Sequence, residues 1–428
     1  VIEEAPSVLL DDAARARIGQ AAVETAKSVD YRGAGTVEFI VSADAPDEFF
    51  FMEMNTRLQV EHAVTELVTG IDIVEWQLRI AAGEPLDFGQ DDVHLTGHAV
   101  EARIYAEDPA TGFIPTGGRV LTPVQPEGAG VRVDSALLDG LTVTSDYDPM
   151  LAKVIAWGPD RETAMRRLQR ALGDTVTHGV TTNVEFLTLL LADPDVIAGR
   201  LDTELIDRRL GSLAFRTADS TVFASAALIL HALDAAAIGS SPSRAPGWRI
   251  GEDAPVRYRL RATDELVGVA IQGSAADAVV SLGGVQQRAR VTVLGNVARV
   301  RLDGLTHSMT FTRHGDRLHL SQDGATWTID DVRWQRAPSA AVNANPDIRS
   351  PMPGLVVAVF VADGEVVETG AAIASVEAMK MEYVLKASSS GTVALRVEVG
   401  SQVAADEVVA SITLDGHENP PTTAGADR

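Results

Sequence analysis

Two stretches near the C-terminal end of the chain repeat one pattern of residues. Gly364 to Val376 ends in Ala-Ser-Val and Gly400 to Ile412 ends in Ala-Ser-Ile, with Val367 and Val403 at the same offset. Such a repeat in short apolar runs predicts two similar sets of strands that pack face to face. This end of the chain is therefore constrained to form a small β-sandwich with approximate two-fold symmetry.

A lysine lies between two of these predicted strands. The motif Glu377-Ala378-Met379-Lys380-Met381 is flanked by apolar runs at 371–376 and 383–386, which places Lys380 at a hairpin tip. The alternative interpretation is an exposed, unmodified hairpin lysine beside chance methionines, although such a lysine has no need of a rigid presenting turn. The motif resembles the biotinyl-lysine site of biotin carboxyl carrier domains, whereas lipoyl domains of the same fold normally lack methionine on both sides of the lysine. Pro351-Met352-Pro353-Gly354 resembles the entry to the same carrier domain. Together these resemblances imply that a biotin protein ligase attaches biotin covalently to Lys380.

Composition excludes several classes of function. The 428 residues include no cysteine and carry a net charge of −24. A disulfide, a thiolate metal site and a cysteine nucleophile are therefore excluded, and nucleic-acid binding is disfavoured. We expect no run of membrane-spanning length, no membrane attachment and a location in a bacterial cytoplasm. Because Val1 falls inside a segment with the pattern of folded structure, we also expect an N-terminal part before it.

Polar side chains share one face of a predicted hairpin in the first 70 residues. A helical rhythm over 11–29 precedes two predicted strands, 36–41 and 49–54, joined by a turn-rich segment. Strand periodicity places Glu38 on one face of the first strand, and Glu53 and Asn55 together on one face of the second. If these faces coincide, their oxygens form a set that suits Mg²⁺.

The alternation of polar and apolar residues continues after this hairpin. Arg57, Gln59 and Glu61 extend the polar face, offering a planar cation for an oxyanion and a carboxylate for proton transfer. Alternation alone favours a simpler interpretation, in which the polar face of a half-exposed strand is only solvated.

Resemblance to a known family favours chemistry instead. Gly33 to Phe39 reads GAGTVEF and Glu53 to His62 reads EMNTRLQVEH, which resembles the ATP-grasp half of biotin carboxylase. The resemblance implies that ATP is a substrate. It also implies a set of ligands for Mg²⁺ or Mn²⁺, a second set of residues that bind bicarbonate, and a base that deprotonates bicarbonate. These are Glu38, Glu53 and Asn55 for the metal, Arg57, Gln59 and the Val60 backbone for bicarbonate, and Glu61 as the base.

The following region mixes helices over 73–82, 161–172 and 184–191 with a strand over 151–157. Gly97 to Pro109 reads GHAVEARIYAEDP and resembles the strand and turn that close the carboxylase site. From the residues alone Arg103 fits an ion pair best. The resemblance implies that Arg103 stabilises the biotin enolate, as a fixed cation beside a developing oxyanion would.

Short alternating segments between 248 and 336 predict an antiparallel β-barrel or sandwich, with one apolar helix over 220–237 before it. We expect His307, His314 and His319 to be scattered surface histidines. By its position this region resembles the domain that holds biotin carboxylase to its carboxyltransferase. It is too short for a TIM-barrel transferase of about 250 residues, so the transferase is expected on a separate β subunit.

The predicted fold class is multidomain α+β: a partial ATP-grasp biotin carboxylase, a barrel with one helix, and a β-sandwich. The expected divisions are 1–70 (C-terminal half of the ATP-grasp domain), 71–212 (carboxylase C-terminal domain), 213–336 (docking barrel), 337–346 (linker), 347–415 (carrier) and 416–428 (disordered tail).

As a whole the chain resembles the biotin-containing α subunit of acyl-CoA carboxylases. Val74 to Glu84 and Glu101 to Tyr105 most resemble the 3-methylcrotonyl-CoA carboxylases of leucine breakdown. The resemblance implies a carboxyltransferase β subunit in an α6β6-type assembly, with the acyl-CoA bound by that partner. A propionyl- or acetyl-CoA carboxylase subunit and a non-catalytic carrier and docking module remain alternatives. Without the preceding ATP-site residues, the chain alone is expected to be inactive.

Overall fold

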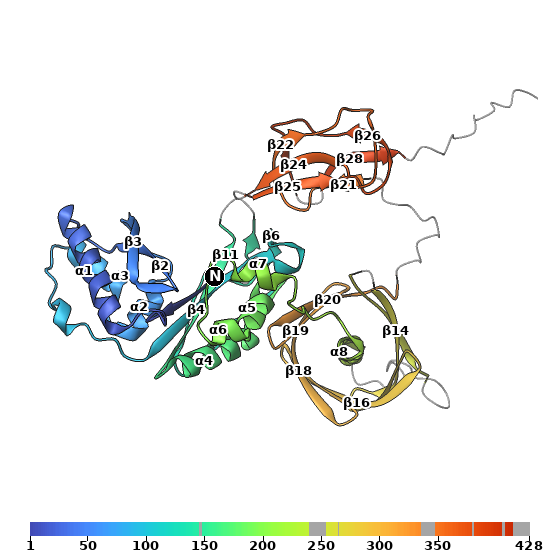
Figure 1. Cartoon of the computed structure of the whole chain (residues 1–428). Helices are drawn as coiled ribbons and strands as arrows, with labels where there is room; N and C mark the ends of the chain where they lie inside the picture. Colours follow the sequence, from blue (N-terminus) through green and yellow to red (C-terminus); the bar gives the residue numbers. More distant parts are fainter. Residues whose placement is uncertain are drawn as a thin grey trace, which may run out of the picture. The chain divides into compact units, whose positions relative to one another are not determined.

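The computed structural model describes residues 1–144, 148–238, 254–263, 265–334, 347–378, 381–404 and 407–413 (Figure 1). The chain forms two compact units, one of residues 1–105, 120–141 and 150–333, and one of 106–119, 142–149 and 334–428. Each unit is described by itself.

The first unit begins with the predicted helix and hairpin. Helix α1 (Asp12–Ser28) starts where the Asp11 side chain accepts a hydrogen bond from the Ala14 backbone, which satisfies one otherwise free N–H group. Strands β2 (Thr36–Ser42) and β3 (Ala45–Asn55) pair antiparallel. Strand β3 starts at Ala45, four residues before the predicted start at 49, and it ends at Asn55. Helices α2 (His62–Thr69) and α3 (Ile73–Ala81) follow it.

A four-stranded antiparallel sheet follows, in the order β1-β4-β11-β9. Its members are β1 (Ile2–Ala5), β4 (His98–Tyr105), β11 (Met150–Gly158) and β9 (Val131–Ser135). Helix α2 packs Ala63, Val64 and Val68 against Ala99 and Ile155 of the two central strands. Because a strand exposes alternate residues to each face, the other odd-numbered side chains of β4 also point toward α2.

The remaining elements before the barrel are helices and a short two-stranded sheet. The helices are α4 (Arg161–Asp174), α5 (Val184–Leu191), α6 (Pro194–Ile197) and α7 (Leu205–Leu210), and β8 (Thr122–Val124) pairs with β12 (Val176–His178). Leu168, Leu172, Phe186 and Leu187 are almost fully buried, so α4 and α5 contribute much of the core.

The predicted barrel is confirmed as a closed barrel of eight antiparallel strands that surrounds α8 (Ser220–Ile238), as Figure 1 shows. The strands are β13 (Val256–Ala262), β14 (Glu265–Ser274), β15 (Asp277–Leu282), β16 (Val285–Leu294), β17 (Val297–Leu302), β18 (Leu305–His314), β19 (Arg317–Gln322) and β20 (Ala325–Asp331). Alternate side chains point inward onto the apolar helix.

The expectation of no run of membrane-spanning length is wrong by length and composition. Among the described helices, Ser220–Ala237 is long and apolar enough to cross a membrane, and 56% of this window is buried. Its place inside the barrel accounts for the apolar composition, because the inward side chains of the strands surround it.

The barrel also contacts β12 through a histidine pair. His178 lies 2.8 Å from Thr312 Oγ1 and 2.9 Å from Ser321 Oγ, and its ring stacks on His319 with centroids 5.7 Å apart. His319 is 7% exposed, so its assignment as a surface histidine is wrong. The cause is a partner 141 residues away, which no local pattern reveals.

The second unit contains two short pairings, β5 (Glu107–Asp108) with β6 (Ile114–Pro115) and β7 (Gly118–Arg119) with β10 (Thr142–Val143), and the predicted sandwich. One sheet of the sandwich has the order β21-β28-β26-β23 and the other β25-β24-β22-β27. Their bounds are β21 (Asp347–Arg349), β22 (Gly354–Val359), β23 (Val366–Val367), β24 (Ala372–Ala378), β25 (Met381–Lys386), β26 (Gly391–Leu395), β27 (Gln402–Val403) and β28 (Val408–Thr413).

The sequence repeat maps onto the two sheets. Strands β23 and β24 come from the first repeat, and β27 and β28 come from the second. The first strand of one repeat lies in the same sheet as the second strand of the other, so β23 joins β28 and β27 joins β24. Val367 and Val403 are both buried in the shared core. The predicted β-sandwich is therefore confirmed, and the close approach of β22 to β24 depends on Gly354, where a Cβ would lie 2.5 Å from the Glu377 carbonyl oxygen.

Candidate functional site

The β2–β3 hairpin brings three of the predicted site residues together. Glu38 and Glu53 are directly paired across the strands. Asn55 Nδ2 donates to Glu38 Oε1 at 2.6 Å and to Glu53 Oε1 at 3.1 Å. The two carboxylates therefore converge on one amide group, on the face that strand periodicity predicts.

This donor set fits a hard divalent cation. Two carboxylates lie around the amide hydrogens of Asn55, at a place where positive charge is favoured, and the amide can turn to offer its oxygen instead. The described residues contain no cluster of three or more histidine, aspartate or glutamate side chains placed to hold a metal. A cation held by Glu38, Glu53 and Asn55 would therefore complete its shell with water or substrate oxygens, as Mg²⁺ commonly does.

Arg57 and Gln59 continue this polar network, although no strand carries them. Gln59 Nε2 donates to Glu38 Oε1 at 2.9 Å, and Arg57 Nη1 donates to Gln59 Oε1 at 2.7 Å. The single extended polar face expected through residue 61 is wrong, because β3 ends at Asn55 and a loop leads into α2. The loop nevertheless returns Gln59, which is 9% exposed, to Glu38.

Glu61 and Arg103 form the second half of the site. Glu61 immediately precedes α2, and Arg103 lies on β4; Arg103 Nη2 donates to Glu61 Oε2 at 2.7 Å. The Val60 carbonyl oxygen accepts a hydrogen bond from Lys153 Nζ at 2.6 Å. Two cations from adjacent strands, β4 and β11, thus hold the loop that carries Glu61.

Sequence reasoning missed Lys153 and Glu101. Lys153 pairs with Arg103 across β11 and β4 and is 7% exposed. Glu101 is fully buried, 3.7 Å from Arg103 Nε and 3.8 Å from Lys153 Nζ. Each is the single charge in an apolar run, Ala99 to Ala102 and Leu151 to Trp157, and that contrast is the signal that could have revealed them.

The burial of Glu101 changes its ionisation. Removal from water raises the pKa of this carboxyl from 4.5 to about 7, although the positive charges of Lys153 and Arg103 oppose the rise. The site therefore contains a carboxylate whose charge responds to pH in the neutral range.

Lys380 and Met379 lie outside the described residues. The strands on either side of them are described, and Ala378 of β24 pairs with Met381 of β25. The predicted attachment lysine thus falls, by sequence, between two strands that form a hairpin.

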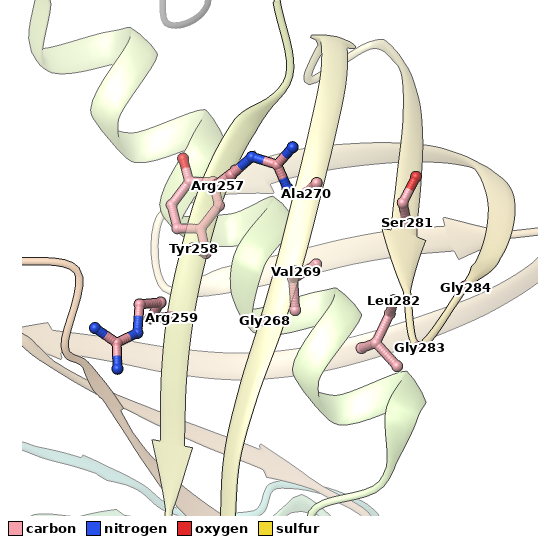
Figure 2. Close-up of a pocket in the computed structure, with 10 residues that line it drawn as sticks. All are labelled: Arg257, Tyr258, Arg259, Gly268, Val269, Ala270, Ser281, Leu282, Gly283 and Gly284. Carbon is pink, nitrogen blue, oxygen red and sulfur yellow. The ribbon is translucent and has the colours of Figure 1, made fainter. Parts of the chain in front are cut away.

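The described surface of the barrel also carries a pocket of about 330 Å³ (Figure 2). Its lining comes from β13, β14 and β15 and the turn after β15, and includes Arg257, Arg259, Gly268, Ala270 and Ser281. None of the sequence-predicted site residues lies in it.

Four family models match the chain in succession. They are the carbamoyl-phosphate synthase L chain ATP-binding domain at 1–88, the biotin carboxylase C-terminal domain at 101–208, the BT domain of the methylcrotonyl-CoA carboxylase α subunit at 219–334, and the biotin-requiring enzyme domain at 346–412. The site described above falls in the first two matches.

Curated relatives agree with these matches. The mitochondrial methylcrotonoyl-CoA carboxylase α subunit of Arabidopsis thaliana is 36% identical, over 94% of this chain and 61% of the relative. The propionyl-CoA carboxylase α chain of Ruegeria pomeroyi is 35% identical, over 96% of this chain and 65% of the relative. The biotin carboxylase of Halalkalibacterium halodurans is 49% identical, over 49% of this chain and 46% of the relative.

Among solved structures, a pyruvate carboxylase from Rhizobium etli is similar with a TM-score of 0.51 and 35% identity, over 57% of this chain and 24% of that chain. The chain spans 57 to 65% of the length of the curated methylcrotonoyl- and propionyl-CoA carboxylase subunits that it matches.

Proposed function

From the premise that the chain is built of the domains of biotin-dependent carboxylases, we propose that it is the biotin-carrying α subunit of an acyl-CoA carboxylase. In this proposal biotin on Lys380 is carboxylated with ATP and bicarbonate. The carboxyl group is then transferred to an acyl-CoA on a separate β subunit. 3-Methylcrotonyl-CoA is the favoured acceptor, which would give the enzyme a role in leucine breakdown.

The observation that carries the proposal is that the loop between β3 and α2 contributes to two hydrogen-bonded polar groups. One is the hydrogen-bonded series from Arg57 through Gln59 to Glu38, and the other is the Arg103–Glu61 pair. The first offers a cation and a metal-binding set, and the second a base beside a second cation. Activation of bicarbonate needs these groups close together.

Each residue has a proposed task. Glu38, Glu53 and Asn55 would hold Mg²⁺ or Mn²⁺, which neutralises charge on the ATP phosphates. Arg57 and Gln59, with the Val60 backbone, bind bicarbonate, since a guanidinium group matches a planar oxyanion.

Glu61 accepts the bicarbonate proton, and Arg103 supplies a fixed positive charge where negative charge develops on the acceptor. Biotin, when attached, carries the carboxyl group between sites.

The partner assignments belong to the same proposal. The barrel would dock the subunit onto a carboxyltransferase β subunit, as the match to a BT domain of a carboxylase α subunit suggests. An α6β6-type assembly, modification by a biotin protein ligase, the domain divisions given above and a bacterial cytoplasmic location remain predictions. The curated relatives include mitochondrial and bacterial proteins.

A propionyl-CoA carboxylase is the second candidate. The Ruegeria pomeroyi propionyl-CoA relative is 35% identical, against 36% for the Arabidopsis thaliana methylcrotonoyl-CoA relative, so identity does not separate the two substrates. Incorporation of labelled bicarbonate into a panel of acyl-CoAs, with the complete subunit and its co-purifying β partner, separates them. Labelling of none of the acyl-CoAs, although biotin and ATP are present, would contradict both.

Two substitutions test the site assignments, each in its own assay. Glu53→Gln should abolish Mg²⁺-dependent cleavage of ATP in the presence of bicarbonate, while Asp47→Asn, on the same strand, should not. Lys380→Arg should abolish binding of streptavidin to the subunit, whereas Lys386→Arg, on β25, should retain it. Equal behaviour of a variant and its control would refute the corresponding assignment.

A further inference from the structure

Glu101 lies on β4, a central strand of the β1-β4-β11-β9 sheet, where burial of a charged carboxylate is unfavourable in free energy. Its neighbours along β4, Val100 and Ala102, are fully buried, and so is Glu101 itself. Within the described residues, neither of its carboxylate oxygens has a hydrogen-bond partner, and neither does Arg103 Nε. A buried charge without such bonds lowers stability, so its presence in an apolar strand calls for a functional reason.

The register places Glu101 behind the candidate site. Glu101 and Arg103 point to the same face of β4, because they are two residues apart. Lys153 lies directly opposite Arg103 on β11. Glu101 Oε1 is 3.7 Å from Arg103 Nε, and its Oε2 is 3.8 Å from Lys153 Nζ.

Both cations reach from Glu101 to the loop before α2. Arg103 donates to the Glu61 side chain, and Lys153 donates to the Val60 carbonyl oxygen. Glu101 therefore sits on the inner side of two cations whose outer sides hold the proposed base and the residue before it.

The charge of the proposed base changes during the reaction. When Glu61 accepts the bicarbonate proton, it becomes neutral and its attraction for Arg103 weakens. The Glu3 carboxylate, 3.4 Å from Arg103 Nη2, is 34% exposed and therefore screened by water. A buried carboxylate behind Arg103 is not screened in this way.

We propose that Glu101 is a positioning residue that keeps Arg103 and Lys153 in place while Glu61 alternates between its charged and neutral forms. This inference rests on the proposed function, since it needs Glu61 to act as a base and Arg103 to act on the acceptor. Glu101 itself touches neither substrate nor cofactor and acts through the two cations.

The charged groups that face Glu101 come from every neighbouring element. They are Glu3 on β1, Arg103 on β4, Lys153 on β11 and Glu61 before α2, while Asp134 on β9 lies 3.3 Å from Lys153 and Glu66 on α2 pairs with Arg132. Of these, Glu3 provides the matched control, because it also neighbours Arg103 but is partly exposed.

The test uses the complete subunit with saturating free biotin and follows bicarbonate-dependent ADP formation and biotin carboxylation across pH. Glu101→Gln should lower kcat for biotin carboxylation about 10- to 100-fold, as small displacements of a site cation do, with KM for ATP unchanged. Glu3→Gln should stay within about two-fold of the unsubstituted enzyme, since exposed charges contribute little.

The pH profile gives a readout that a merely structural role would not move. Because burial raises the pKa of Glu101 to about 7, the unsubstituted enzyme should lose kcat as pH falls through this value. Glu101→Gln has no charge to lose and should lack this limb. An unchanged profile together with unchanged kcat would overturn the inference.

Arg103→Gln distinguishes failure of this inference from failure of the proposed function. If Arg103→Gln retains biotin carboxylation, the proposed function is wrong. If Arg103→Gln loses it and Glu101→Gln does not, only the positioning role is wrong. Should Glu101→Gln not fold, Glu101→Asp replaces it: the acid limb should persist with kcat lowered several-fold, and an unchanged kcat would refute the role.

Discussion

Replacement of Glu101 by glutamine should make the fold more stable at alkaline pH, although it should harm catalysis. In the folded protein the pKa of Glu101 is about 7, against an ordinary value of 4.5. Because the folded pKa is raised, the contribution of this group is fully present below pH 4.5 and is lost as pH rises through 7. Above pH 8 the ionised carboxylate costs about 3 kcal/mol, at 1.36 kcal/mol for each unit of pKa.

Glutamine has nearly the same shape and cannot ionise, so it removes this cost. The difference in opening free energy between Glu101→Gln and the unsubstituted chain should be close to zero at pH 5 and about 3 kcal/mol in favour of the variant at pH 8. Hydrogen exchange of the β4 and β11 amides measures this opening locally, without requiring the whole chain to unfold in one step.

Comparison of variant and parent at the same pH cancels the intrinsic exchange rate. Glu3→Gln should show no increase in opening free energy at pH 8, because Glu3 is partly exposed. Protection of the β4 and β11 amides in Glu101→Gln, relative to the parent at the same pH, that is lower at pH 8 than at pH 5 would refute the reasoning. It would mean that Lys153 and Arg103 stabilise the carboxylate by more than burial destabilises it.

Three further predictions follow from other parts of the fold. Gly354→Ala should destabilise the C-terminal sandwich by about 2 kcal/mol or more, because the added Cβ would collide with a β24 carbonyl oxygen. Gly19→Ala in α1, whose Cβ would meet nothing within 4 Å, should instead stabilise the fold by up to about 1 kcal/mol. Calorimetry of the two variants measures both changes as shifts in melting temperature. His178→Phe should destabilise the fold by about 1 to 3 kcal/mol in urea unfolding, since the Thr312 and Ser321 hydroxyl groups each lose their bond to His178 and keep one other bond. Burial lowers the pKa of His178 to about 3 and that of His319 to about 4. The stability that these neutral rings contribute above pH 6.5 should therefore be lost as pH drops toward these values. The urea midpoint of His178→Asn should fall less over the same pH range than that of the unsubstituted chain.

Local patterns predicted the parts of the site that lie on one hairpin. Strand periodicity places Glu38, Glu53 and Asn55 on a common face, and the hairpin joins them without any long-range information. The loop that returns Gln59 to Glu38 was not predictable from periodicity, because alternation does not show where a strand ends.

Features that depend on distant pairing were missed. Glu101 and Lys153 meet only because β4 pairs with β11, and the register of two strands about 50 residues apart is set by packing of the whole sheet. The contact of His178 with His319 has the same origin. A charge alone in an apolar run marks such positions in a sequence, but it does not identify the partner.

The closed barrel limits how a partner can recognise this region. Seven of the eight junctions between neighbouring strands are paired over five to seven positions, so they offer few free backbone N–H and C=O groups to a strand from another chain. The eighth junction, between β13 and β20, pairs only at Leu260–Asp331 and Arg261–Asp330. Away from that seam, recognition must then use side chains on the outer face and the hairpin turns, whereas at the seam the exposed Arg261–Asp330 ion pair joins β13 to β20. Partner choice in this region can therefore change by surface substitution while the inward side chains around α8, and with them the fold, stay the same.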